Sequence, residues 1–150
     1  MCMFHPIGYV HTERKEKLDH NWGDLTSNII INPELSAGLK GLEEFSHILV
    51  IYHLHEAMFV QDKHLQRRPQ GRNDMPTVGI FSQRAKDRPN PIGVTAIKLI
   101  SIERNIIQVQ GLDAIDGTPV LDIKPYYPQY DSKPTATVPE WVNVLMKDYF

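Results

Sequence analysis

The segment from Arg84 to Leu99, RAKDRPNPIGVTAIKL, places cationic side chains beside two prolines and a glycine, directly before an apolar run. Pro89 and Pro91 fix two φ angles and bias the residues before them toward extended backbone. Such a turn loses little conformational entropy when a ligand binds to it. Arg84 and Arg88 supply planar, permanently charged donors that suit a carboxylate or a phosphate. The segment predicts a preorganised anion-binding corner, and the alternative is a solvated corner with surface arginines.

A second dense segment, LDAIDGTPVLDIKPYYP, covers Leu112 to Pro128 and carries three carboxylates close in sequence, Asp113, Asp116 and Asp122. The letters DGTP within it indicate a turn in which Asp and Thr side chains cap backbone amides. The functional alternative is a carboxylate and a hydroxyl that bind a ribose or an amine. The tyrosines at positions 126 and 127 either stack on a base or pack in the core.

Two histidines alternate in the short segment YHLHE, at His53 and His55. If a strand continues through them, both point to one face. That arrangement allows a metal site, because histidine is a common ligand, but no clear third ligand accompanies the pair. The interpretation we favour places His55 and Glu56 at a strand end, where they line a pocket through hydrogen bonds.

The sequence lacks the two common loops that hold a nucleotide at the start of a helix. No G-x-G-x-x-G pattern follows a strand, and no G-x-x-x-x-G-K-[ST] pattern occurs. The G-x-S-x-G elbow of serine hydrolases is also absent. A nucleotide-like ligand would therefore need another kind of site.

Short apolar runs rich in β-branched residues must position these segments, and turn residues separate the runs. Their close spacing predicts a barrel or a sandwich. Arg104-Asn105 predicts a tight hairpin in which Asn takes left-handed angles, and Gly93 permits either an unusual backbone geometry or a close approach. The expected strands are Ile7–His11, Asn28–Ile31, His47–His55, Val78–Ser82, Gly93–Ile102, Ile106–Leu112 and Val120–Ile123.

Helical signals are fewer. Pro33 can open a short helix toward Leu42, since proline suits the first helical turn. A second helix is expected after Pro139, and it should dock on the barrel or on a partner subunit. Its apolar face carries Trp141, Val142, Leu145 and Tyr149. Between Met58 and Pro76 the periodicity vanishes, which predicts a long polar loop.

The composition sets outer limits on the function. With 150 residues, 41% hydrophobic and 23% charged, the chain has the size and balance of one folded domain. Its net charge of -2 gives no global basic field, so a polyanion must be bound by a local patch. The single cysteine, Cys2, excludes an internal disulfide and fits a reducing cytoplasm. With no signal peptide and no long apolar run, we expect one cytoplasmic domain over residues 1–150 without an additional C-terminal domain.

Together these segments resemble one family closely. GIFSQRAKDRPNPIG is similar to the family signature G-V-F-x-T-R-S-P-x-R-P-N-P-I-G, and both arginine positions survive where the intervening residues differ. LDAIDGTPVLDIKPY resembles L-D-x-x-D-G-T-P-x-L-D-I-K-P-Y, and GLKGLEEFSHI resembles G-L-x-x-F-S-H-I. The family is the TsaA-like, or TrmO-type, group of S-adenosylmethionine-dependent methyltransferases, and the resemblance runs from about Phe4 to Tyr130.

The resemblance implies a mainly β fold, a small single β-barrel with short peripheral helices and a C-terminal helix, usually as a homodimer. It implies S-adenosylmethionine as the cofactor and N6-methylation of a modified adenosine beside the tRNA anticodon. Longer family members carry an additional C-terminal domain. The implied cofactor contacts are Asn21, Trp22, Gly23, His55, Glu56, Arg84, Val94, Asp113, Asp116, Gly117 and Thr118.

For such a methyl transfer, we expect Arg84 to pair a carboxylate of the ligand, Asn90 to orient the acceptor, and Asp116 to accept a proton late in the transfer. A local cationic cluster would bind the tRNA phosphates, and the alternative is a solvated basic loop. Its members are Lys63, Arg67, Arg68, Arg72, Lys86 and Arg88. The open alternatives are methylation of a small molecule or protein, a dimeric sensor that binds the cofactor without transfer, and, more remotely, a metal-binding barrel.

Overall fold

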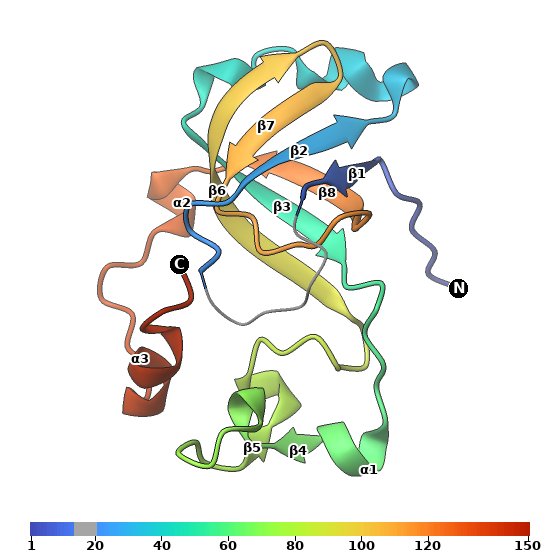
Figure 1. Cartoon of the computed structure of the whole chain (residues 1–150). Coiled ribbons are helices and arrows are strands. Elements are labelled where there is room, and N and C mark those ends of the chain that lie inside the picture. Colours follow the sequence, from blue (N-terminus) through green and yellow to red (C-terminus); the bar gives the residue numbers. More distant parts are fainter. Residues whose placement is uncertain (14–20) are drawn as a thin grey trace.

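The computed structural model describes residues 1–13 and 21–150. Six antiparallel strands close into a barrel in the order β1-β2-β7-β6-β3-β8 (Figure 1). These strands are β1 (Gly8–His11), β2 (Thr26–Ile31), β3 (His47–His53), β6 (Ile92–Glu103), β7 (Ile106–Gln110) and β8 (Pro119–Pro125). The barrel that the sequence predicted is confirmed.

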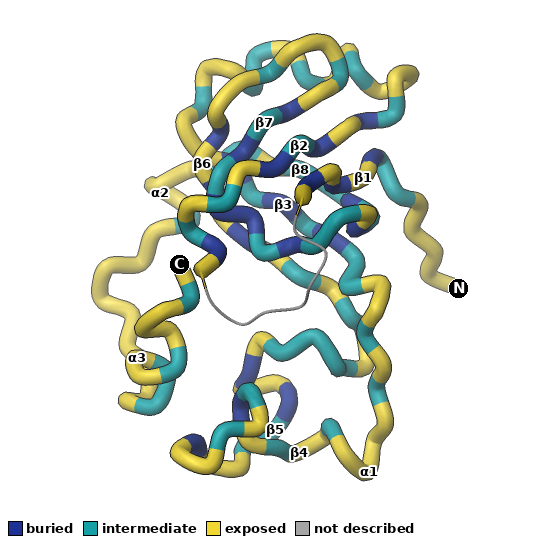
Figure 2. Tube along the Cα trace, in the orientation of Figure 1, coloured by how far each residue is buried: buried dark blue, intermediate teal, exposed yellow. Residues whose placement is uncertain are grey.

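Alternate side chains of each strand point into the barrel, as the twofold period of a strand requires. Ile29, Ile48 and Ile107 are fully buried there. Burial of each such side chain contributes about 1.5–3 kcal/mol to folding. The buried residues concentrate in the barrel strands (Figure 2), so the barrel is the rigid part that positions the site.

Two strands end earlier than the sequence indicated. β3 stops at His53, and residues 54–56 turn away, so the prediction that His53 and His55 share a strand face is wrong. The amide of Leu54 donates to the carbonyl oxygen of Pro91 at 2.8 Å, which ties this turn to the chain entering β6. β7 stops at Gln110 because Gly111 takes a φ of 93°, which leaves the strand conformation.

The β6–β7 hairpin forms at Arg104-Asn105, as expected, but the left-handed residue of the turn is not the one predicted. Arg104, and not Asn105, takes the positive φ, at 58°. The Asn105 side chain instead donates to the carbonyl oxygen of Ile31 at 2.7 Å, and the Asn105 carbonyl accepts from the Ile31 amide at 2.8 Å. Asn105 therefore anchors the hairpin to the end of β2.

Residues 54–91 form a separate lower lobe between β3 and β6 (Figure 1). It holds α1 (Gln61–His64), the two-stranded pair β4 (Gln66–Arg67) and β5 (Val78–Gly79), and 3-10 turns at Pro69–Gly71 and Ile80–Ser82. The long polar loop predicted from Met58 to Pro76 therefore contains short secondary-structure elements that the sequence did not indicate. The strand predicted at Val78–Ser82 is wrong in part, because only two of its residues pair and they pair outside the barrel.

The helices are short. The segment after Pro33 forms 3-10 turns at Pro33–Leu39 and Leu42–Glu44, and α2 (Pro128–Asp131) follows the barrel. The expected C-terminal helix is α3 (Glu140–Met146). Its predicted apolar face is half-buried at all four positions, Trp141, Val142, Leu145 and Tyr149, although Tyr149 lies beyond the helix end. Among the described residues, no helix has the length and apolarity to cross a membrane.

Candidate functional site

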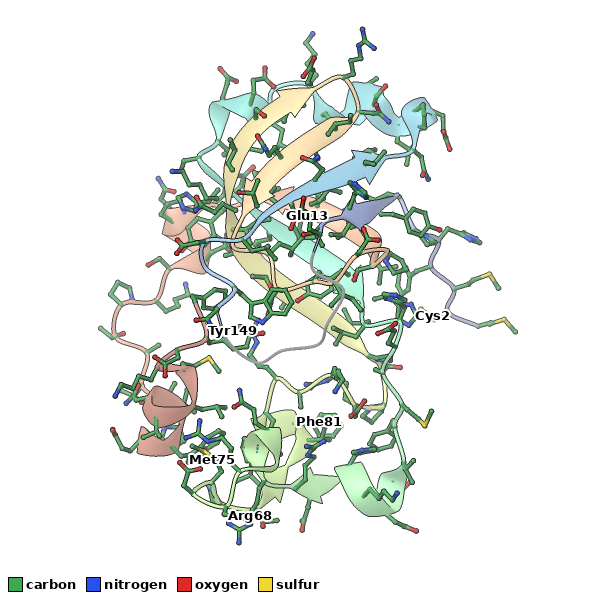
Figure 3. All side chains as sticks on the ribbon, in the orientation of Figure 1. Cys2, Glu13, Arg68, Met75, Phe81 and Tyr149 are labelled. Carbon is green, nitrogen blue, oxygen red and sulfur yellow. The ribbon has the colours of Figure 1, made fainter. Side chains whose placement is uncertain are left out.

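One carboxylate at the end of the barrel that faces the lower lobe gathers three hydroxyl donors. Oδ1 of Asp113 accepts from the Tyr52 hydroxyl at 2.9 Å and from the Thr95 hydroxyl at 2.5 Å. Oδ2 accepts from the hydroxyl of Tyr149, which arrives from the end of the described chain (Figure 3). The hydroxyl oxygens of Tyr52 and Thr95 lie 3.2 Å apart, within hydrogen-bond distance. We call these four residues the Asp113 cluster.

The barrel register assembles this cluster. Tyr52 is the last inward side chain of β3 and pairs with Gly93 of β6, and Thr95 is the next inward position. A Cβ atom on Gly93 would lie 2.5 Å from Cζ of Tyr52, so the glycine leaves room for the ring. Gly93 has no left-handed φ. Of the two roles that the sequence allowed for this glycine, the structure selects close approach.

Tyr52 is a permanent donor in this arrangement. Burial raises the pKa of the Tyr52 hydroxyl far above its usual value, and the negative charge of Asp113 raises it further. The hydrogen bond with Thr95 and the positive charge of Arg84 act in the opposite direction. The phenol therefore stays protonated at neutral pH, which suits it to fix the carboxylate and not to act as a base.

The segment from Arg84 to Val94, which we call the proline corner, leads directly into Thr95 of the Asp113 cluster. The Arg84 guanidinium donates to the carbonyl oxygen of Val94, the residue before Thr95. Arg88 donates to the carbonyl oxygens of Gln83 at 2.9 Å and Ala85 at 3.2 Å, so this arginine shapes the turn from within. The predicted acceptor-orienting residue, Asn90, is exposed, and its carbonyl accepts from the amide two residues on at 2.7 Å.

The DGT turn is bound mainly to β1. Oδ1 of Asp116 accepts from the Thr12 amide at 3.1 Å and lies 3.3 Å from Nδ1 of His11. Gly117 takes a φ of 83°, and its amide donates to the carbonyl oxygen of Val10 at 2.8 Å. The Thr118 hydroxyl donates to Ile115 at 2.7 Å. These contacts are the capping arrangement that the sequence allowed, and they place Asp113, three residues earlier, at the mouth of the barrel.

The segment Asn21–Gly23 meets the end of the described chain. The Asn21 amide donates to the carbonyl oxygen of Asp148 at 3.0 Å, and the Trp22 amide donates to that of Tyr149 at 2.9 Å. A Cβ atom on Gly23 would lie 2.7 Å from the backbone of Phe150. Residues 21–23 and Asp113, which are distant in sequence, are thus joined through one short segment, residues 148–150.

The predicted RNA-binding cations lie in or beside the lower lobe, and most of them already bind acceptors there. The guanidinium of Arg68 donates to the carbonyl oxygens of Met75 and, at 3.2 Å, Asn73 (Figure 3). Arg72 makes a bidentate pair with Asp74, at 2.7 and 3.0 Å. This lobe has few buried apolar side chains, chiefly Met75 and Ile80, and polar contacts supply much of its order.

Asp87 lies beside two further predicted cations, Arg67 and Lys86. Its carboxylate lies 3.6 Å from Nζ of Lys86 and 3.8 Å from both Nη1 of Arg67 and Nε2 of His64. Partial burial acts to raise the pKa of Asp87, but a hydrogen bond from the Met58 amide and the neighbouring positive charges outweigh it, so the pKa lies below its usual value. The corner that precedes β6 is thereby fastened to the lobe.

Among the described residues, the two histidines of the YHLHE segment form no metal site with their neighbours. His53 ends β3, and His55 and Glu56 lie exposed in the following turn. Within residues 1–13 and 21–150, no three His, Cys, Asp or Glu side chains come together as metal ligands. His55 and Glu56 do lie near the proline corner, since the Leu54 amide binds Pro91.

Two open hollows mark the surface. One, of about 580 Å³, lies between the lower lobe and α3 and is lined partly by Asn21, Arg72 and Asp148. The other, of about 510 Å³, lies at the far end of β3, where the rings of Phe45 and Tyr127 stack at 5.9 Å. The first includes two sequence-predicted site residues, Asn21 and Arg72, and it adjoins the segment that carries Tyr149.

Four residues of the site were not predicted as functional from the sequence: Tyr52, Thr95, Gln83 and Tyr149. The sequence did contain a signal for Tyr52 and Thr95. Both are polar residues at inward positions of predicted strands, where apolar residues are expected, and such residues often lie where the apolar core ends. Gln83 is buried, and its amide donates to the carbonyl oxygens of Arg67 at 2.9 Å and Val78 at 3.0 Å, which supports the corner from the lobe. Tyr149 had no local signal, because only the tertiary fold brings it to Asp113.

Comparison with known proteins places this arrangement in a family. The family model for the tRNA-methyltransferase O N-terminal domain matches residues 17–132. A probable S-adenosyl-L-methionine-binding protein of Pyrococcus abyssi is 39% identical over 143 residues, which cover 92% of this chain and 75% of that protein. The human tRNA (adenine(37)-N6)-methyltransferase is 41% identical over 115 residues, which cover 77% of this chain and 25% of that protein.

A solved structure agrees with these sequence matches. The crystal structure of TrmO from Pseudomonas aeruginosa superposes with a TM-score of 0.75 at 29% identity and covers 93% of this chain. The present chain spans 61% of that TrmO chain. The family match includes the barrel strands from β2 to β8 and the segment from Arg84 to Val94. The protein therefore belongs to the tRNA-methyltransferase O family, the TsaA-like group that its signature segments resemble.

Proposed function

We propose that this protein is an S-adenosylmethionine-dependent methyltransferase that methylates N6 of a modified adenosine beside the anticodon of tRNA. The observation that carries the proposal is the Asp113 cluster, to which three separate family segments contribute within a shared barrel. The YHLHE segment supplies Tyr52, the PNPIGVT segment supplies Gly93 and Thr95, and the LDAIDGTP segment supplies Asp113. Membership of the methyltransferase family supports the same conclusion.

The polar groups at this end of the barrel match the chemistry of the cofactor. A carboxylate held by neutral hydroxyl donors keeps its negative charge available for ribose hydroxyls or for a cationic group. Arg84 adds a permanent positive charge for a ligand carboxylate, and Val94 lies directly beside it. We assign the remaining cofactor contacts to residues 21–23, to His55 and Glu56, and to Asp116, Gly117 and Thr118.

S-adenosylmethionine, when bound, supplies a methyl group that its sulfonium already activates. The residues of this chain then have to align the acceptor nitrogen, and alignment alone accounts for much of the rate of such a displacement. We assign Asn90, exposed at the proline corner, to orient the acceptor base. Asp116, whose side chain is 30% exposed, is our candidate to receive the proton that leaves the nitrogen.

We assign the tRNA contacts to Lys63, Arg67, Arg68, Arg72, Lys86 and Arg88. Arg68 and Arg88 bind backbone carbonyls and keep their full charge, so they still attract phosphate while they hold the lobe together. A cytoplasmic location, which we also propose, would give access to tRNA. The single cysteine, exposed at Cys2, fits that reducing compartment.

We further propose a homodimer through the outer face of β3 and β6. Two of its apolar side chains, Ile92 and Val94, are 44% and 43% exposed, and Val94 pairs across the strands with Ile51. Contiguous exposed apolar surface is typical of an interface, and a twofold axis lets one patch cover its own copy. Ile92→Lys should therefore convert a dimer to a monomer in sedimentation experiments.

The matched control is Ile30→Lys, which changes an isoleucine of similar exposure, 42%, on the outside of β2. That variant should remain dimeric. A wild-type monomer, or dissociation by both variants alike, would contradict an interface at β3 and β6.

The function is tested by methyl transfer. Purified protein with S-adenosylmethionine carrying a labelled methyl group should label tRNA taken from cells that lack this modification. Mass spectrometry of the digested nucleosides should locate the label on N6 of the hypermodified adenosine beside the anticodon. Transfer should weaken steeply with added salt if phosphate contacts hold the tRNA. Labelling of bulk protein or of small molecules instead of tRNA would contradict the assigned acceptor.

A second candidate function is binding of S-adenosylmethionine without transfer, as in a sensor. It is favoured by the Pyrococcus abyssi relative, which is named a probable S-adenosyl-L-methionine-binding protein and which this chain matches over 75% of its length. Cofactor binding in calorimetry together with no transfer to RNA, protein or small molecules would select this candidate.

A further inference from the structure

Tyr149, near the end of the described chain, donates a hydrogen bond to Asp113, the carboxylate to which we expect the cofactor to bind. Oδ1 of Asp113 is held inside the barrel by Tyr52 and Thr95, which leaves Oδ2 as the oxygen that faces outward. Among the described residues, the hydroxyl of Tyr149 is the donor to Oδ2. Figure 3 shows Tyr149 at the mouth of the barrel, between the barrel and the lower lobe.

The same segment also covers residues 21–23, the other part of the proposed cofactor site. Backbone amides of Asn21 and Trp22 donate to the carbonyls of Asp148 and Tyr149, at 3.0 and 2.9 Å. Phe150 packs on Gly23. The rings of Phe150 and Tyr149 contact each other edge to face, with their centroids 4.7 Å apart. An aromatic ring with a hydroxyl donor therefore lies where a nucleoside with its hydroxyls would bind.

The part of the chain that carries this segment is only lightly attached. Residues 132–139, which lead to α3, are all exposed, and α3 contains no fully buried residue (Figure 2). Asp148 faces the same open hollow as Arg72, whose positive charge attracts it. Elements with few buried contacts open at a low free-energy cost, so this arm, residues 132–150, can leave while the barrel stays folded.

From this geometry we propose that the arm is a self-inhibitory plug, in which Tyr149 substitutes for a donor of the ligand at Oδ2 of Asp113. The inference rests on the proposed function, because the competing ligand is S-adenosylmethionine. The cofactor binds to the fraction of molecules in which the arm is open, so its apparent affinity is reduced by that fraction. Release of the arm and binding of the cofactor are then coupled in both directions.

The test uses the full chain and the variant Tyr149→Phe, which keeps the ring and removes only the hydroxyl donor. Calorimetry with S-adenosylmethionine should show roughly 10-fold tighter binding, because the competing charge-assisted hydrogen bond is lost. Tyr130→Phe is the matched control, since Tyr130 is 77% exposed on α2, and it should leave the affinity unchanged. In the wild-type protein, hydrogen–deuterium exchange of residues 140–150 should rise when the cofactor is added.

Unchanged or weaker binding by Tyr149→Phe, or increased protection of residues 140–150 by the cofactor, would overturn the plug while the proposed function stands. Such a result would indicate that the arm forms part of the cofactor-binding site and does not compete with the cofactor. Absence of cofactor binding by the wild type and the variant alike would contradict the proposed function, and the plug would fall with it.

Discussion

Gly93→Ala should destabilise the barrel and abolish most cofactor binding together. The new Cβ would lie 2.5 Å from Cζ and 2.9 Å from the hydroxyl oxygen of Tyr52, whose ring is buried at 3% exposure. Overpacking of this kind costs about 1–3 kcal/mol, which corresponds to a fall in Tm of roughly 3 to 10 °C for a chain of this size. A ring that moves away from this Cβ atom shifts the hydroxyl that donates to Asp113, so cofactor affinity should fall at least about 10-fold.

The matched control is Gly38→Ala. A Cβ atom at Gly38 meets nothing within 4 Å, and the residue lies in the 3-10 turn after Pro33, away from the site. Its Tm and its cofactor affinity should both match the wild type, as measured by calorimetry. Wild-type behaviour of Gly93→Ala would show that the position of the Tyr52 ring does not depend on this glycine, and it would contradict the packing role assigned to Gly93.

Asp113→Asn should weaken cofactor binding with little loss of stability. The amide has the shape of the carboxylate, and its oxygen can still accept from Tyr52 and Thr95. The side-chain NH2 group of the new asparagine replaces Oδ2. This group can donate a hydrogen bond to the oxygen of Tyr149, but it cannot accept a hydrogen bond from a ligand. Loss of a hydrogen bond to a charged group corresponds to about 1.5–3 kcal/mol, so the cofactor Kd should rise roughly 10- to 100-fold.

Asp122→Asn serves as the control for charge alone. Asp122 lies on β8 with its side chain half exposed, and its carboxylate pairs with Lys124 at 3.0 Å. Removing one negative charge there should change cofactor affinity little, because exposed pairs contribute little. Equal weakening by both variants would indicate a long-range charge effect. Unchanged affinity in Asp113→Asn would remove Asp113 from the cofactor site.

The two predictions separate two functions of the same cluster. Gly93 acts through packing, so its replacement should disturb stability and binding together. Asp113 acts through its outward oxygen, so its replacement should disturb binding alone. A site built in this way keeps its acceptor oriented before the ligand arrives, which lowers the free-energy cost of binding.

Much of the architecture followed from local pattern. Alternating β-branched runs predicted the barrel strands, and the signature segments indicated the family, because these signals are contained within a few consecutive residues. The same local rules misplaced some boundaries. β3 ends before His55 since the chain must turn toward Pro91, and the lower lobe was mistaken for a loop because side-chain hydrogen bonds, which leave no periodicity, supply much of its order.

The sequence by itself determined most of the barrel strands, the stiff corner from Arg84 to Val94 and the DGT turn, because backbone preferences and hydrophobic periodicity act over short distances. Only the tertiary structure decided that Asp113, and not the turn-bound Asp116, gathers the donors at the barrel mouth. It alone brought Tyr149 to that carboxylate, 36 residues away along the chain. Contacts between distant segments depend on how the whole barrel closes, and no local pattern encodes that closure.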